Sequence, residues 1–252
     1  MSVMDDNRRR VEGVFEVAEK LVGIDDLVMV GGYAVSVRGR PRFSHDLDLV
    51  VSVPALVAVH DVLRSCGFEA KNRFENPEKP QNVYKGETVR WSRDSTRSTM
   101  DILIGGLVDP KVRLWIPYEE IAKGKTRERI PNVIGISKSP TIPTAATEVL
   151  VALKLQPGRP QDCSDILSLV PVADPAECAA TALGFFGKAT TLKLIRWLVD
   201  DIDPDEDKWG HAIRYQVPKE AVRKSMVAAL AFFEKMRTSV EKTAISASGT
   251  KE

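Results

Sequence analysis

The chain has 252 residues, of which 43% are hydrophobic and 28% are charged, and its formal net charge is +1. This length allows one large domain or two modest ones, and the composition is that of an ordinary globular protein. The small net charge excludes a global electrostatic attraction to nucleic acid, although local basic patches would still permit binding.

Neither a targeting signal nor a membrane span is expected. The N-terminal stretch MSVMDDNRRR is polar and lacks the apolar core of a secretory signal. No apolar run approaches the roughly 18 residues that a membrane helix needs. The three cysteines (Cys66, Cys163 and Cys178) lack metal-ligand spacing and are expected to be reduced thiols of a cytoplasmic protein.

The first half of the chain alternates helix and strand signals. Apolar residues at helical spacing predict an amphipathic helix over residues 8–22, and a short strand, DDLVMV, follows and ends at Gly31-Gly32. Helical spacing resumes in YAVSVRG. Pro41 then breaks the pattern before SHDLDLVVSV, a strand rich in Val and Leu. A helix from Pro54 to about Ser65 comes next.

Polar and apolar stretches then alternate up to residue 140. Residues 71–86 are expected to form a polar loop or the tip of a hairpin, and ETVRWSR and STMDILIGG are predicted strands. Two further strands, at the edge of a sheet, are predicted at VRLWIP and NVIGIS. The basic stretch KGKTRER, Lys123–Arg129, is interpreted as a solvated loop, with contact to RNA as the other reading.

Helices dominate after Thr144. They are predicted at AATEVLVALKL, DCSDILSLV, PAECAATALGFF, ATTLKLIRWLVDDI and from Pro218 to about Val240. This change predicts an α+β protein with a small mixed sheet flanked by helices in residues 1–140 and a helical region in residues 141–240. Residues 241–252 are expected to be a disordered tail.

Two aspartates in the strand SHDLDLVVSV point to a cation. Residues two apart in a strand project to the same face, so Asp46 and Asp48 lie together while Leu47 and Leu49 face the core. Two close carboxylates repel each other unless a divalent cation neutralises them. Mg²⁺ prefers one or two carboxylates plus substrate phosphates, so Mg²⁺ (or Mn²⁺) is the expected cofactor. The alternative is a solvated strand edge.

Two other features support a phosphate-transfer site. Asp101 precedes the apolar run of STMDILIGG, so it would stand on the sheet face beside the pair and complete a metal site. A capping role in a turn is the alternative for Asp101. Gly31-Gly32 lies between a strand and a helix start, where backbone N–H groups suit a phosphate, although a plain turn fits equally.

The order of these features separates classes of enzyme. The acidic pair precedes its apolar run, whereas haloacid-dehalogenase phosphatases and Asp-x-Asp glycosyltransferases carry the pair after it. Gly31-Gly32 followed by Ser44-x-Asp46-x-Asp48 and a later strand aspartate resembles the nucleotidyltransferase superfamily named after DNA polymerase β. GGYAVSVRGRPRFSHDLDLVV looks most like the AbiEii/MenT-type toxins and related minimal nucleotidyltransferases.

This resemblance implies roles for further residues. Arg42 and Ser44 match the basic residue and the Ser or Thr that precede the acidic pair in that subgroup, which places them with Gly31 and Gly32 at the nucleotide. The family's later motif, a helical Lys followed by Arg and Asp-x-x-Asp, is matched by four residues: Lys154, Arg159, Asp162 and Asp165.

The later motif also has a structural interpretation. Asp162 and Asp165 would share one helix face. Lys154 and Asp162 would act in the nucleotide or acceptor pocket, and a salt bridge between Lys154 and either aspartate is the rival reading. The alternative to a phosphate contact for Ser44 is a hydrogen bond to local backbone. The alternative to substrate contact for Arg38, Arg40 and Arg42 is a solvated basic run. His45 should face away from the pair.

The function implied is transfer of a nucleoside monophosphate from an NTP to a hydroxyl, with release of pyrophosphate. Asp46, Asp48 and Asp101 would hold metal, and Asp101 would also help to deprotonate the acceptor. The acceptor would be tRNA, a protein or a small molecule, and a partner antitoxin would accompany a toxin. The alternatives are a catalytically weak binding component of a toxin–antitoxin pair and a metal-dependent phosphodiesterase.

Overall fold

The structure is a computed structural model that describes residues 3–71, 86–109, 114–136, 138–156 and 158–248. The chain divides into two compact units. Unit 1 comprises residues 1–37 and 41–146, and unit 2 comprises residues 38–40 and 147–252. All strands of the described residues belong to unit 1, and unit 2 is helical. The α+β class predicted from the sequence is therefore confirmed.

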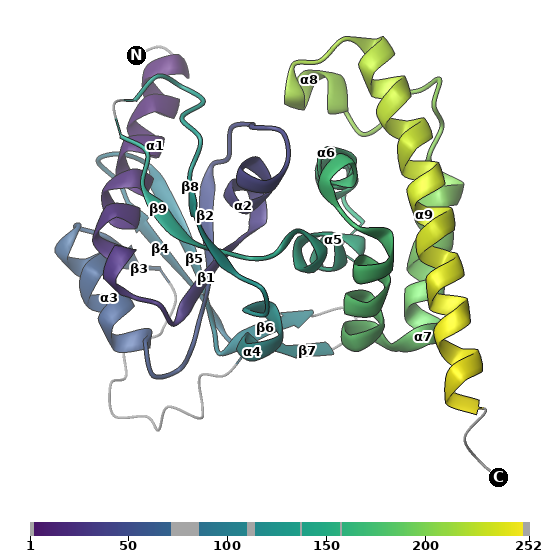
Figure 1. Cartoon of the computed structure of the whole chain (residues 1–252). Coiled ribbons are helices and arrows are strands. Elements are labelled where there is room, and N and C mark those ends of the chain that lie inside the picture. Colours follow the sequence, from purple (N-terminus) through teal and green to yellow (C-terminus); the bar gives the residue numbers. More distant parts are fainter. Residues whose placement is uncertain (1–2, 72–85, 110–113, 137, 157, 249–252) are drawn as a thin grey trace. The chain divides into compact units, whose positions relative to one another are not determined.

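Helices and strands alternate in unit 1 as predicted for its first part, and Figure 1 labels them. In chain order they are α1 (Val3–Lys20), the 3-10 turn η1 (Leu21–Gly23), β1 (Leu27–Val30), α2 (Gly31–Arg38), β2 (Asp46–Val51), α3 (Leu56–Ser65), β3 (Glu69–Ala70), β4 (Thr88–Arg93), β5 (Ser98–Ile104), β6 (Gly106–Asp109), β7 (Leu114–Pro117), α4 (Tyr118–Ile121), β8 (Thr126–Arg129) and β9 (Thr141–Thr144).

A mixed seven-stranded sheet forms the centre of unit 1, with strand order β3-β4-β5-β2-β1-β9-β8. Strand β2 runs parallel to β5 and antiparallel to β1. The remaining strands, β6 and β7, pair with each other in a separate two-stranded sheet. The sheet therefore places β2 between β1 and β5, with β4 on the far side of β5.

One face of this sheet is the apolar core. Helix α1 packs on β5 and α3 contacts α1. A Cβ at Gly13 of α1 would meet the Ser98 side chain, so the face of β5 that carries Ser98 also carries Met100 towards α1. Met100 pairs in register with Leu47 of β2. Both side chains are fully buried, as the alternation of the sequence predicts.

Two predictions for residues 105–140 need correction, those for NVIGIS and for Lys123–Arg129. Residues 132–136 of NVIGIS form no strand and contain a turn, whereas Thr126–Arg129, interpreted as part of a solvated loop, is edge strand β8. Charged side chains hide this strand from a pattern search, because an exposed edge is commonly protected by charge. The described part of VRLWIP is β7, but it pairs with β6 and not with the main sheet.

Unit 2 is built from packed helices. They are α5 (Thr147–Leu155), α6 (Pro160–Leu169), the 3-10 turn η3 (Val170–Val172), α7 (Pro175–Asp201), α8 (His211–Tyr215) and α9 (Lys219–Ser248). Helix α7 joins two predicted helices across a kink at Gly187, and it packs against α5 and α9. The short helix α8 was not predicted from the sequence.

The boundaries of the units and of α9 depend on strand pairing and helix length. Strand β9 pairs with β1 and β8, so residues 141–146 stay with unit 1, beyond the boundary expected at residue 140. Helix α9 continues to Ser248, through much of the segment expected as a disordered tail. The rest of that tail, and residues 72–85 of the expected polar loop, lie outside the described residues. Every helix in the described ranges is too short or too polar to pass through a lipid bilayer.

Candidate active site

The acidic pair lies at the start of β2, beside the end of β1. Because β1 and β2 are antiparallel, Val30 at the end of β1 pairs with Asp48 near the start of β2. Leu47 and Leu49 are fully buried, and Asp46 and Asp48 are partly exposed on the opposite face. The antiparallel pairing therefore explains how an acidic pair at the beginning of a strand can meet a glycine turn at the end of another.

Asp101 stands in register with this pair. Strands β2 and β5 are parallel, and their pairing sets Asp46 opposite Thr99 and Asp48 opposite Asp101. Paired residues of neighbouring strands project to the same face of a sheet. The three aspartates predicted as metal ligands therefore share one face of unit 1.

Thr99 and Arg90 bind two of the three carboxylates. The Thr99 hydroxyl donates a hydrogen bond to Asp46 Oδ1. Arg90 of β4 donates from Nε to Asp101 Oδ1 at 2.8 Å and from Nη2 to Oδ2 at 2.6 Å. Hydrogen bonding to Asp101 and its charge raise the pKa of Arg90, and the charges of Asp46 and Asp48 raise that pKa further. The charges of all three carboxylates therefore act on Arg90, and its guanidinium donates to both oxygens of Asp101.

These contacts decide how well the site fits a metal. Among the described residues, no three acidic, histidine or cysteine side chains converge closely enough to hold one metal ion. Asp46 and Asp48 share a face and supply the hard oxygen donors that Mg²⁺ takes together with phosphates and water. The donor set thus fits a cation bound by the pair. Asp101, the third predicted ligand, is held by Arg90 through two hydrogen bonds.

The glycine turn is packed against the acidic pair and the residues before it. Gly31 has φ 68°, and a Cβ there would overlap the Asp48 carboxylate. A Cβ at Gly32 would overlap the Ser44 side chain and lie 2.8 Å from Arg42 Nη2. The fold therefore brings four of the five residues predicted at the nucleotide, Gly31, Gly32, Arg42 and Ser44, together with Asp48, and glycine permits the close approach. The fifth, Asp162, lies in unit 2.

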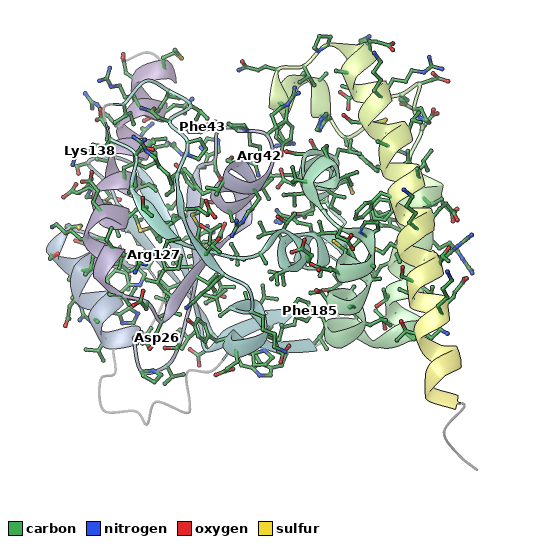
Figure 2. All side chains as sticks on the ribbon, in the orientation of Figure 1. Asp26, Arg42, Phe43, Arg127, Lys138 and Phe185 are labelled. Atoms are coloured by element: carbon green, nitrogen blue, oxygen red, sulfur yellow. The ribbon has the colours of Figure 1, made fainter. Side chains whose placement is uncertain are left out.

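Arg42 and Ser44 are held by local backbone. Arg42 lies on the loop between α2 and β2 (Figure 2), it is 5% exposed, and its Nη1 donates to the Phe43 carbonyl at 2.9 Å. The Ser44 hydroxyl donates to the Asp46 carbonyl at 3.4 Å. His45 is exposed, and its Nδ1 lies 3.2 Å from Arg10 Nη1. The local hydrogen bond considered for Ser44 is thus present, and it leaves the side chain against the glycine turn.

Tyr33 of α2 is a further neighbour of the pair that the sequence did not reveal. Its side chain is 3% exposed. Burial raises the pKa of the Tyr33 hydroxyl, and the negative charge of Asp46 raises it further. Among the described residues the buried Tyr33 hydroxyl has no hydrogen-bond partner.

The later motif forms a buried ionic network in unit 2. Lys154 Nζ lies 2.7 Å from Asp162 Oδ1 and 2.9 Å from Asp165 Oδ2. Arg159 Nε donates to Asp162 Oδ2 at 2.6 Å, and the Tyr215 hydroxyl donates to Asp165 Oδ1 at 2.8 Å. The fold therefore assembles the four predicted residues and adds Tyr215, which lies far away in the sequence.

Both aspartates of this network are fully buried, and Lys154 is 8% exposed. Burial works against ionisation of Asp162, but Arg159 and Lys154 outweigh it and hold the pKa of Asp162 below its usual value. Lys154 thus forms ion pairs with two buried carboxylates, which is the salt bridge considered as the alternative to a role in a pocket. A role for Lys154 and Asp162 in a nucleotide or acceptor pocket stays a prediction.

Comparisons with known proteins identify a family. Residues 18–196 match the family model described as nucleotidyl transferase AbiEii toxin of a type IV toxin–antitoxin system. This range contains the sheet face that carries Asp46, Asp48 and Asp101, here called the acidic face, and it also contains the later motif. A comparison with curated proteins gives no match.

Solved structures show weaker likenesses. The crystal structure of JHP933 from Helicobacter pylori is 13% identical, with a TM-score of 0.49 and full coverage of both chains. A candidate nucleotidyltransferase from H. pylori is 14% identical, with a TM-score of 0.47 and coverage of 96% of this chain and 99% of that one. Because both TM-scores lie below 0.5, the family assignment depends on the family model.

Proposed function

Because the chain belongs to the AbiEii family of nucleotidyltransferase toxins, we propose that it transfers a nucleoside monophosphate from an NTP to an acceptor hydroxyl and releases pyrophosphate. The acceptor is a hydroxyl of RNA, protein or a small molecule. One observation carries this proposal: the strand pairing that sets Asp48 opposite Asp101 and next to the Gly31 turn. The chain is thereby a candidate toxin with a cognate antitoxin as its partner.

The residues of the acidic face have separate tasks. A divalent cation held by Asp46 and Asp48 would neutralise charge on the phosphoryl oxygens. The first amide groups of α2, at Gly31 and Gly32, lack partners within the helix and suit the β- and γ-phosphates. The Thr99 hydroxyl orients Asp46.

Polar side chains around the turn complete the proposed nucleotide site. Ser44 and Arg42 approach Gly32 closely, so a hydroxyl and a guanidinium are available where the phosphates would lie. Arg is well suited to phosphate because its planar group donates in pairs. Asp101 is the third candidate ligand and the candidate base for the acceptor hydroxyl. Most of the rate enhancement in this reaction comes from positioning and charge neutralisation.

Transfer of label from α-labelled NTPs tests the proposal. The wild type should label an RNA or protein acceptor with at least one of the four NTPs and release pyrophosphate. Asp48→Asn keeps the size of the side chain but removes its charge, so we expect a loss on the order of 100-fold or more. Asp61→Asn, at an exposed position of α3, is the matched control and should keep wild-type activity.

Two results would speak against this function. Equal labelling by the wild type and Asp48→Asn would favour the catalytically weak binding component of a toxin–antitoxin pair. Hydrolysis of a phosphodiester without pyrophosphate release would favour a metal-dependent phosphodiesterase. Circular dichroism and thermal unfolding of each variant establish that the fold is intact.

A further inference from the structure

Arg90 and Asp101 form a bidentate ion pair on the acidic face. Two parallel N–H···O bonds of 2.8 and 2.6 Å join the guanidinium to both oxygens of the carboxylate. Bidentate pairs of this kind are stronger and more directional than single contacts between charges. The guanidinium therefore contacts both carboxylate oxygens, and its positive charge competes with any metal ion that approaches them.

The two partners differ in how firmly they are placed. The Asp101 side chain is 15% exposed, and the Arg90 side chain is 52% exposed. Arg90 belongs to β4 and is paired in register with Asp101 of β5. A half-exposed arginine on a long, flexible stem can move away, while a carboxylate on a central strand cannot move far. The pair can therefore open by movement of Arg90.

The charges on the acidic face favour separation of Arg90 from Asp101 when a cation binds. Asp101 lies opposite Asp48, and Asp46 lies two residues before Asp48 on the same side of β2. Arg90 supplies one positive charge to this group of three carboxylates. A divalent cation bound by the pair would supply two, at the same place, and would repel the guanidinium.

We propose that Arg90 acts as an exchangeable counter-ion: it holds Asp101 in the metal-free protein and gives up this carboxylate when a divalent cation binds. Arg90 then weakens metal binding in the nucleotide-free protein, because the cation must displace it from Asp101. Its released guanidinium pairs with a phosphate oxygen of the NTP. This inference rests on the proposed function, because it takes the metal and the NTP from there.

If Arg90 has only a supporting role, removing it should change the metal affinity in the opposite direction. If Arg90 only supports Asp101 in the orientation that a metal needs, its removal should weaken metal binding by about 10–100-fold, as is usual for residues behind a metal ligand. If Arg90 competes with the metal, its removal should strengthen binding. The direction of the change therefore separates exchange from support.

Mn²⁺ binding to the full-length protein without nucleotide tests the exchange, by electron paramagnetic resonance or calorimetry. For Arg90→Gln we expect a dissociation constant about tenfold lower than that of the wild type, because a competing charge is removed. Arg90→Lys keeps the charge but cannot form the paired hydrogen bonds, so it should fall between the two. With NTP present, Arg90→Gln should raise KM more than it lowers kcat.

Arg127→Gln is the matched control. Arg127 also lies on a strand and pairs with an aspartate, Asp25, at 2.5 Å. Its strand, β8, is separated from β5 by β9, β1 and β2 in the sheet. The same net charge is therefore removed away from the acidic face, and wild-type Mn²⁺ affinity is expected.

The outcomes distinguish this inference from the proposed function. Unchanged or weaker Mn²⁺ binding by Arg90→Gln, while Asp48→Asn abolishes binding, overturns the exchange and leaves the metal site intact. Equal Mn²⁺ binding by the wild type and Asp48→Asn, or none by either, overturns the metal site and the exchange with it.

Discussion

Gly31 occupies a position that no residue with a side chain can share. Its positive φ is unfavourable for L-residues, and a Cβ would enter the space of the Asp48 carboxylate. Gly32 has the same relation to Ser44 and Arg42. The glycine pair thus permits close packing of polar groups as well as the turn itself. Binding of phosphate by these glycines stays a prediction.

Lys154 is the other residue whose surroundings define its role. Its ammonium group lies between two carboxylates that are fully buried. A buried charge is tolerated only when it is paired and hydrogen-bonded. Removal of Lys154 would leave two buried negative charges on α6 with fewer partners.

Lys154→Met should therefore lower the free energy of unfolding by about 3–5 kcal/mol, the usual cost of removing one partner of a buried ion pair. Denaturant titration measures this change. Lys193→Met, at an exposed position of α7, should stay within about 0.5 kcal/mol of the wild type. A loss of activity by Lys154→Met at unchanged stability would instead support the predicted role in the nucleotide or acceptor pocket.

At the scale of elements, α7 shows how one residue changes a helix. Gly187 has φ 71° and ψ 167°, a conformation that is essentially restricted to glycine, and it interrupts a helix that runs from Pro175 to Asp201. The Thr191 hydroxyl donates to the Gly187 carbonyl at 2.8 Å and lies 3.0 Å from the Ala182 carbonyl. A buried threonine therefore supports the kink.

Two glycines of α7 provide a matched pair of substitutions. A Cβ at Gly187 or at Gly184 would meet no atom within 4 Å, so only backbone conformation distinguishes them. Gly187→Ala should destabilise the protein by about 1–3 kcal/mol because of its positive φ. Gly184→Ala should stabilise it by about 0.5–1 kcal/mol, since alanine favours a helix. Urea unfolding of both variants checks the opposite signs, and equal effects would contradict the kink.

At the scale of the whole molecule, buried ionisable groups couple stability to pH. Burial and the nearby Arg64 lower the pKa of His60 in unit 1 to about 4, although Asp61 acts in the opposite direction. In unit 2, Asp162 has a lowered pKa, so its contribution is lost only as the pH falls below the usual range of a carboxyl group. His60 therefore affects stability at a higher pH than Asp162 does.

Proton uptake by His60 determines whether the free energy of unfolding rises or falls with pH. Between about pH 4 and 6.5 the unfolded chain binds a proton at residue 60 that the folded protein does not. The free energy of unfolding should therefore rise with pH in this window, by at most about 1.4 kcal/mol per pH unit from this group. His60→Gln should flatten the dependence in urea titrations from pH 4.5 to 7. Parallel curves for His60→Gln and the wild type would refute the assignment.

Much of unit 1, and the acidic pair of the candidate site, can be predicted from local sequence. Alternation along β2 is enough to place Asp46 and Asp48 on one face and Leu47 and Leu49 in the core, because side chains of a strand alternate whatever surrounds it. The spacing of Asp162 and Asp165 likewise predicts that they share a helix face, and both contact Lys154. Such features depend on only a few neighbouring residues.

Other features depend on which segments meet. Alternation with the buried Val89 and Trp91 places Arg90 on the polar face of β4, but only the β4–β5 register sets it opposite Asp101. Strand β8 exists because it pairs with β9, and its own residues carry no apolar pattern. Tyr215 reaches Asp165 across the packing of unit 2.

The sequence by itself determined the family, the mixed α+β character and the chemical nature of the acidic face, because short motifs and periodicity are local properties. The tertiary structure decided which groups contact the acidic side chains: Arg90 pairs with Asp101, the Thr99 hydroxyl donates a hydrogen bond to Asp46, and Lys154 pairs with Asp162 and Asp165 of α6. Strand register and helix packing bring together residues from distant parts of the chain, and no local pattern specifies those pairings.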